Sequence, residues 1–225
     1  MGHMAQERRA NPTIGMLTSF PPTPCGLATF SAGLADGLCN KGSDVGVIRV
    51  ADGAQSSSTA VIGEFVNGSS ASVDSCVELL NQRDVAVIQH DHDLFGTEVL
   101  DVVEALRVPT LVVAHEILKH PTPQQRSLME TMAAKADRIV VMSRAANDRL
   151  CADYAVDGGR VVTIQRGATL PTVAPLKRSG RPTLLTWGLM GPGKGVERVI
   201  DAMSGLKDLR GQPRQIGRAS CRERV

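Results

Sequence analysis

Four short runs of consecutive aliphatic residues constrain the fold of this chain more than any other feature. They lie at residues 85–88, 111–113, 139–142 and 161–164. Uninterrupted aliphatic runs of this length are typical of strands that are buried on both faces, as in a parallel sheet. Two further runs, at residues 13–18 and 45–50, also have the character of strands.

Stretches of helical length separate these runs. One apolar stripe follows the run at residues 13–18, and a second stripe covers residues 99–106 and ends before Pro109. Ser143 is placed to cap a third helix that runs to about residue 154. The first stripe consists of Leu27, Phe30, Leu34 and Leu38. Alternating strands and helices predict an α/β fold with a doubly wound, Rossmann-like parallel sheet and right-handed crossovers.

Changes in composition divide the chain into segments. Residues 1–12 start with MGHM, the pattern of a cloning scar, and we expect a disordered start there. Residues 13–167 should form the N-terminal domain, in which we expect residues 50–75 to hold one short strand near Val61 and otherwise loops. Residues 168–182 contain prolines and no apolar period, as expected of an interdomain linker. Residues 183–214 then begin a second domain.

The composition argues against several classes of protein. Hydrophobic residues make up 42% of the chain, but no apolar run approaches the roughly 18 residues that a membrane span needs. The five cysteines form no C-x-x-C pair, which favours a reducing, cytoplasmic location over a disulfide framework. The formal net charge of +2 comes from residues 215–225, because the remainder balances 22 basic against 22 acidic residues. Nothing before that segment indicates a nucleic-acid partner.

The strongest site motif follows the expected strand at residues 183–187. There the sequence GLMGPGKG, residues 188–195, leads into a helix with an apolar stripe. The glycines let the backbone approach an anion, the helix N-terminus points N–H groups at it, and the lysine adds a full charge. This is the layout of a phosphate-binding loop. The residues concerned are Gly188, Gly191, Gly193 and Lys194.

This motif has two alternative interpretations. It nearly fits the P-loop pattern G-x-x-x-x-G-K-[ST] of nucleotide-hydrolysing enzymes and kinases. Gly195, however, occupies the last position, where a P-loop carries the hydroxyl that holds magnesium. The second alternative is a tight connection that binds no ligand.

Other candidate residues lie where strands end. Gly26 closes the proline-rich loop SFPPTPCG at residues 19–26, and His90 and His115 follow two of the aliphatic runs, with Glu116 beside His115. The carboxyl ends of parallel strands form the edge where ligands usually bind. We therefore expect Gly26, His90 and His115 to converge there, although each also has a structural explanation as a turn glycine or a core histidine.

A metal site is not expected at the strand end that carries His90. His90, Asp91 and His92 are consecutive, and adjacent side chains at a strand end point in different directions.

Three stretches of this sequence together resemble the retaining, family-4 glycosyltransferases of the GT-B fold. The opening SFPPTPCGLATF at residues 19–30 is similar to a PPxxCGIATF start in one branch of that family. Residues 139–167 resemble the signature at the end of its N-terminal domain. Residues 186–202 resemble the first strand, loop and helix of its second domain. The likeness extends over nearly all of residues 13–214.

The resemblance implies a two-domain enzyme that moves a sugar from a nucleotide-sugar donor to a hydroxyl acceptor. Gly26 would face the donor phosphates, His115 would contact the donor sugar near the reacting carbon, and Lys194 would neutralise the leaving diphosphate. His90 and Glu116 would lie on the acceptor side of the cleft. The resemblance implies no cofactor and no metal, with the nucleotide-sugar as co-substrate.

The chain departs from the family pattern at three places. Leu189 stands where many relatives carry an arginine, and Arg166 stands in place of the histidine of a usual Pro-His-Gly. Residues 215–225 have no periodicity and match the in-frame translation of a common sequencing adapter, so we expect an artefactual tail and a fragment that is inactive alone. A P-loop-like enzyme and a non-catalytic binding module remain the alternatives to the transferase.

Overall fold

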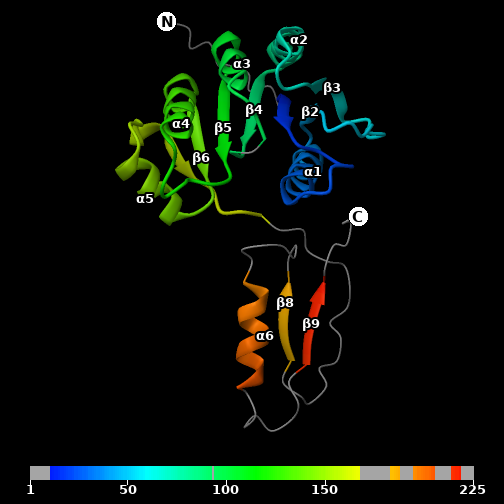
Figure 1. The fold of residues 1–225 in the computed structure, drawn as a ribbon. Helices are drawn as coiled ribbons and strands as arrows, with labels where there is room; N and C mark the ends of the chain where they lie inside the picture. Colours follow the sequence, from blue (N-terminus) through cyan, green and yellow to red (C-terminus); the bar gives the residue numbers. More distant parts are fainter. Residues whose placement is uncertain (1–10, 93, 168–182, 188–194, 206–213, 219–225) are drawn as a thin grey trace, which may run out of the picture. The chain divides into compact units, whose positions relative to one another are not determined.

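Seven strands form one parallel sheet in the computed structural model, which describes residues 11–92, 94–167, 183–187, 195–205 and 214–218. The strand order is β3-β2-β1-β4-β5-β6-β7 (Figure 1), and every neighbouring pair is parallel. The predicted doubly wound sheet is confirmed. The strands are β1 (Thr13–Thr18), β2 (Asp44–Val50), β3 (Val61–Phe65), β4 (Val85–His90), β5 (Thr110–Ala114), β6 (Arg138–Val141) and β7 (Val161–Thr163).

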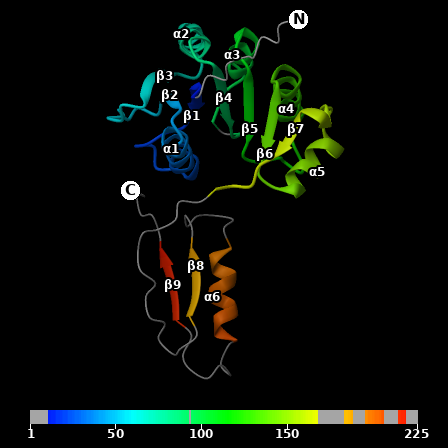
Figure 2. The same cartoon turned by 180° about the vertical axis from the view of Figure 1, so that it is seen from behind.

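Helices cover both faces of this sheet, as Figures 1 and 2 show from opposite sides. Successive residues of β1 point to opposite faces, so Met16 packs in the same cluster as Ala35 of α1, whereas Leu17 packs in the cluster of Leu80 of α2. The helices are α1 (Gly26–Cys39), α2 (Ser70–Asn81), α3 (Val99–Ala105), α4 (Pro123–Lys135) and α5 (Arg144–Asp153), and a 3-10 turn (Gly158–Arg160) precedes β7.

Two of these helices, α2 and α4, were not expected from the sequence. α2 begins at Ser70, inside the stretch for which we expected loops, because Ser69 acts as its N-cap and accepts a hydrogen bond from the Ser72 backbone N–H. Serine disfavours helix interiors but favours caps, which is why a serine-rich stretch suggested a loop. α4 is largely polar, and its buried residues occupy one side only. They are Leu128, Met129, Met132 and Ala133.

A repeated device fixes strands at the amino edge of the sheet. The Asp84 carboxylate accepts hydrogen bonds from the backbone N–H of Thr13 at 2.9 Å and from its hydroxyl at 2.8 Å. In the same way, the Asp137 carboxylate accepts from the backbone N–H of Thr110 at 2.8 Å. Each aspartate directly precedes one strand and binds the first residue of the neighbouring strand. These pairs therefore help to set the parallel register at the edge opposite the candidate site.

The capping box of α4 gives a first prediction. The Thr122 hydroxyl accepts a hydrogen bond from the Gln125 N–H at 3.2 Å, and the Gln125 side chain accepts one from the Thr122 N–H at 2.9 Å. Thr122→Ala should lower the free energy of unfolding by about 1 kcal/mol, measured by urea denaturation, because the backbone N–H of Gln125 loses the hydroxyl that accepts its hydrogen bond. Thr122→Ser keeps the hydroxyl and should lose much less, and equal losses in both variants would contradict this role.

The chain divides into two compact units, Met1–Leu170 and Pro171–Val225. In the second unit β8 (Thr183–Trp187) and β9 (Arg214–Arg218) pair in parallel, and α6 (Val196–Ser204) lies between them in sequence. Most of β9 falls in the segment expected to be an artefactual tail, and the structure gives it a strand. The artefactual origin of that segment stays a prediction. The expected linker at residues 168–182 lies outside the described residues.

None of the helices in the described part of the chain has the length and the apolar character that a membrane span requires. The four cysteines within the described ranges are all free thiols.

Candidate functional site

The order of the strands places a topological switch point between β1 and β4. From β1 the chain moves outward through β2 to β3, and from β4 it moves outward in the other direction. The carboxyl ends of strands at such a point diverge into loops on either side, which leaves a crevice where ligands bind in open α/β sheets. Gly26 follows β1, His90 ends β4 and His115 follows β5. Because these three strands are neighbours, the structure brings the three residues to one edge.

His115 is half-buried at this edge and is held by two contacts. Its Nε2 lies 2.6 Å from the Oε1 atom of Gln89, the penultimate residue of β4, and its ring meets that of Phe30 edge-on, with the ring centroids 5.1 Å apart. Because an amide oxygen can only accept, Nε2 carries the proton and Nδ1 keeps its lone pair. The backbone N–H of His115 also donates to the His90 carbonyl at 3.0 Å.

The surroundings of His115 keep its imidazole neutral. The pKa of His115 is lowered to about 4, mainly by burial and also by the positive charge of Arg166, whereas Asp91 acts in the opposite direction. At neutral pH the ring can therefore donate one hydrogen bond and accept another, but it carries no positive charge.

His90 lies beneath the edge rather than on it. Its side chain is 0% exposed, and neither ring nitrogen has a hydrogen-bond partner among the described residues. It contacts the His92 ring edge-on at 5.1 Å. Burial, followed by the neighbouring His92 and His115, lowers the pKa of His90 to about 3. His90 thus contributes a buried neutral ring below the site, and a direct ligand contact would require it to be uncovered.

Gly26 opens α1 and is exposed, with no atom within 4 Å of where a Cβ would stand. Open space, not crowding, therefore surrounds this position. The residue before it, Cys25, is the N-cap of α1, and its sulfur accepts a hydrogen bond from the Ala28 N–H and lies 3.3 Å from the Ser19 hydroxyl. Glu116, beside His115, is exposed.

The predicted phosphate-binding loop lies mainly outside the described residues, which include none of Gly188, Gly191, Gly193 and Lys194. Gly195 is described, and it is the N-cap of α6 with a left-handed backbone, φ +70°. A serine or threonine, as a P-loop carries here, would be strained in this conformation.

Two groups of contacts at this edge were not predicted from the sequence. The first is Arg49 of β2, which is fully buried and binds both Asp52 and Thr23 of the proline-rich loop. The second is the pair Phe30 and Arg166, in which the guanidinium carbon lies 5.1 Å from the ring centroid. A strand arginine is usually exposed, and contacts between distant residues leave no local pattern, so neither group has a sequence signal.

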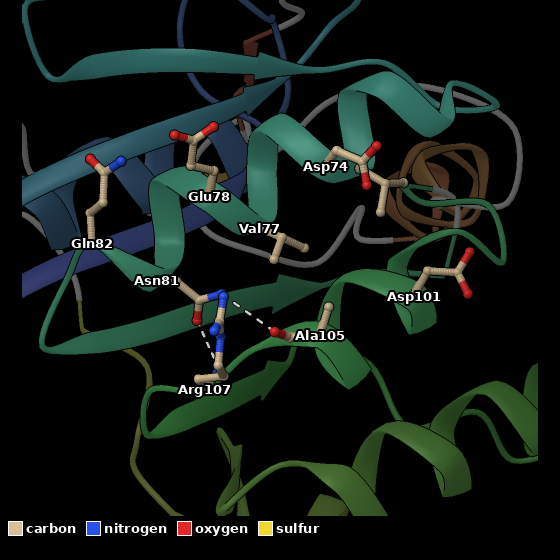
Figure 3. A pocket seen from close by; sticks show the side chains of 9 residues that line it. Asp74, Val77, Glu78, Asn81, Gln82, Asp101, Ala105 and Arg107 are labelled. Atoms are coloured by element: carbon tan, nitrogen blue, oxygen red, sulfur yellow. Dashed lines mark hydrogen bonds between the residues drawn. The ribbon is translucent and has the colours of Figure 1, made fainter.

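The described residues contain no cluster of three or more histidine, cysteine, aspartate or glutamate side chains arranged to hold a metal ion. A groove of about 600 Å³ lies elsewhere, between α2 and α3 (Figure 3). In its floor the Asn81 side chain donates to the Ala105 carbonyl and accepts from the Arg107 N–H. Its charged lining residues are Asp74, Glu78, Asp101 and Arg107, and none of the predicted site residues lines it.

Comparison with solved structures shows which fold this sheet belongs to. HepE of Anabaena, solved with UDP-glucose, aligns with a TM-score of 0.64 and 17% identity over 92% of this chain and 60% of its own. A glycosyltransferase from Rickettsia africae aligns with a TM-score of 0.60 and 15% identity over 93% of this chain and 69% of its own. An alpha-glucosyltransferase, solved with UDP and a 13-mer DNA, aligns with a TM-score of 0.53 and 15% identity over 70% of this chain and 43% of its own. The chain thus spans about four to seven tenths of these proteins, with which it shares the fold.

The fold is that of the N-terminal, Rossmann-like half of a GT-B glycosyltransferase, followed by the first strand and helix of the second half. The family model of Glycosyltransferase Family 4 matches residues 24–170, and the chain belongs to this family. No curated protein matches its sequence.

Proposed function

We propose that this protein acts as a retaining glycosyltransferase, which moves a hexosyl residue from a nucleotide-sugar to a hydroxyl acceptor. Its first unit would bind the acceptor and form one wall of the cleft. The family membership supports the reaction class. The observation that carries the proposal is the neutral, hydrogen-bonded imidazole of His115 at the switch point of the sheet.

His115 would contact the donor sugar close to the reacting carbon. With Nε2–H engaged by Gln89 at 2.6 Å, the free lone pair on Nδ1 can accept a hydrogen bond from a sugar hydroxyl. A positive charge at this place would oppose the oxocarbenium character that develops during glycosyl transfer. The burial that keeps the ring neutral therefore suits this role.

The remaining predicted roles complete the proposal. Gly26, with open space above it, would let the donor phosphates approach α1. Lys194 and the glycines at residues 188, 191 and 193 would hold the leaving diphosphate from the second unit. Glu116 would face the acceptor, and His90 would support His115 from below. The proposed reaction uses the nucleotide-sugar as co-substrate and no metal or other cofactor.

Replacing His115 tests this proposal. In the protein expressed from its complete gene, His115→Ala should lower the rate of sugar transfer from UDP-glucose or another accepted nucleotide-sugar by about 100-fold or more. The measurement is release of the nucleoside diphosphate, with NMR of the product to show whether the anomeric configuration of the donor is kept.

His120→Ala is the matched control, because His120 is exposed and only five residues further along the chain. It should keep the wild-type rate and the wild-type melting temperature. A His115→Ala enzyme that transfers sugar within threefold of wild type would overturn the role given to His115, and a product of inverted configuration would overturn retention.

A further inference from the structure

Arg166 and His115 pack against the same aromatic ring. The guanidinium carbon of Arg166 lies 5.1 Å from the centroid of the Phe30 ring, and the His115 ring lies 5.1 Å from that centroid in an edge-on contact. The two groups are therefore separated by no more than twice this distance. Phe30 belongs to α1, one turn after Gly26, so the three side chains and the start of α1 occupy one part of the sheet edge.

The guanidinium of Arg166 is available to a ligand. Arg166 is exposed, and in the described ranges no carboxylate lies within ion-pairing distance of it and no hydrogen bond engages it. Arg49, at the same edge, is by contrast fully buried and paired with Asp52. A cation that rests on an aromatic face is oriented without using its N–H donors, so all of them remain free.

The charge of Arg166 affects the pKa of His115. After burial, this charge is the next largest cause of the lowered pKa of His115. Because the neighbouring imidazole is neutral, Arg166 supplies a permanent positive charge next to an uncharged hydrogen-bonding ring. The planar fork of a guanidinium matches two oxygens of a phosphate group, and the pair of hydrogen bonds it forms is stronger than that of a neutral donor.

We propose that Arg166, oriented by the ring of Phe30, binds a phosphate group of the ligand that occupies this edge beside His115. The inference rests on the proposed function, and it assigns the phosphate contact to a residue of the first unit. Arg166 is the contact residue and Phe30 a positioning residue. The phosphate can belong to the diphosphate of a nucleotide-sugar or to a phosphorylated acceptor, and both present the same oxygens to the guanidinium.

Binding of two probes to the 225-residue chain tests this contact. Inorganic pyrophosphate represents the donor diphosphate and glucose 6-phosphate a phosphorylated acceptor, each titrated at constant ionic strength while the side-chain NMR signals of His115 are followed. Arg166→Gln should weaken binding of the preferred probe by about 10- to 100-fold, since it removes charge-assisted hydrogen bonds. The probe that loses more affinity identifies the source of the phosphate.

Arg138→Gln is the matched control. Arg138 is also exposed, but it begins β6 at the opposite edge of the sheet. This variant loses the same charge and should keep the wild-type affinity within twofold. Phe30→Leu keeps an apolar side chain but no ring, and it should weaken binding several-fold and shift the His115 signals even without ligand.

A histidine at position 166 offers a sharper version of the test. In wild type the contribution of residue 166 to the probe affinity should stay constant between pH 6 and 8, because a guanidinium keeps its charge over this range. In Arg166→His the affinity should fall as pH rises through about 6.5, where an imidazole loses its charge.

Three results would overturn the inference: no binding of either probe, equal losses of affinity in Arg166→Gln and Arg138→Gln, or no loss of affinity in Arg166→Gln.

Failure of the proposed function is a separate result. If sugar transfer is absent but the probes bind through Arg166, the phosphate contact stands and the transferase proposal falls. If transfer depends on His115 but the probes ignore Arg166, only the phosphate contact falls.

Discussion

Unfolding of this protein should take up about two protons between pH 6 and pH 5, and its stability should fall steadily as the pH is lowered through this range. The cause is the pair of buried imidazoles at the sheet edge. Burial lowers the pKa of His90 to about 3 and that of His115 to about 4 from an ordinary value of 6.5. Between these values the unfolded chain binds protons at both residues and the folded chain does not. The stabilisation that comes from these two neutral imidazoles is complete above pH 6.5, and it is lost progressively as the pH falls toward their pKa values in the folded state.

Urea denaturation at a series of pH values from 7.5 to 4.5 would measure this effect. Two protons correspond to a slope of about 2.7 kcal/mol per pH unit in the free energy of unfolding. His90→Phe should remove about half of the slope, because a neutral ring then occupies the buried site in both states. His120→Gln, at an exposed position, should leave the slope unchanged. A flat profile over this interval would show that neither imidazole is held neutral by the fold.

Arg49→Met should destabilise the first unit by about 3 kcal/mol and loosen the proline-rich loop that precedes α1. Arg49 is 0% exposed and donates hydrogen bonds to the Asp52 carboxylate at 2.7 and 2.8 Å, to the Val50 carbonyl at 3.2 Å and to the Ala54 carbonyl. It also reaches the Thr23 hydroxyl, which in turn donates to Asp52 at 2.7 Å. Methionine keeps the apolar stem but leaves these acceptors without a cation.

The control for this prediction is Arg83→Met. Arg83 forms a similar ion pair with Asp44 at 2.8 Å, but the Asp44 side chain is 70% exposed. Such a surface pair contributes about 0–1 kcal/mol, so this variant should change the free energy of unfolding little. Hydrogen exchange should separate the two effects, because only Arg49→Met is expected to speed exchange at the N–H groups of Thr23 and Cys25. Equal destabilisation by both variants would argue against a special role for the buried arginine.

The strands were predictable because each is marked by its own residues. β1 and β8 match the predicted runs, and β4 and β5 extend theirs by one or two residues, to His90 and Ala114. Ser143 caps α5 as expected, accepting a hydrogen bond from the Ala146 N–H at 3.1 Å. α2 was missed because its first turn lies in a serine-rich stretch, although Val73, Cys76 and Leu80 recur at helical spacing. α4 was missed because most of its residues are polar, and its stability comes mainly from packing its one apolar side against the sheet.

The candidate site was predictable only where it follows from strand order. His90 and His115 stand directly at strand ends, so their approach to one edge requires only that the strands be parallel. The partners of His115 could not be found in this way, because Gln89 and Phe30 look like ordinary strand and helix residues. Arg166 was noticed only as a departure from a related pattern, and its contact with Phe30 joins residues that are far apart in the chain.

The strand order also determines when the sheet can begin to form during synthesis. The central pair is β1 and β4, and the Thr13–Asp84 contacts at its end join residues 71 positions apart. Until β4 leaves the ribosome, β1 can pair only with β2, at the cost of leaving its other edge open. Closing so long a loop is slow, and nascent chains in this interval expose both strand edges and apolar faces. The half-made protein should therefore depend on chaperones more than its finished fold suggests, and a pause in translation placed before residue 90 should lower the yield of folded protein.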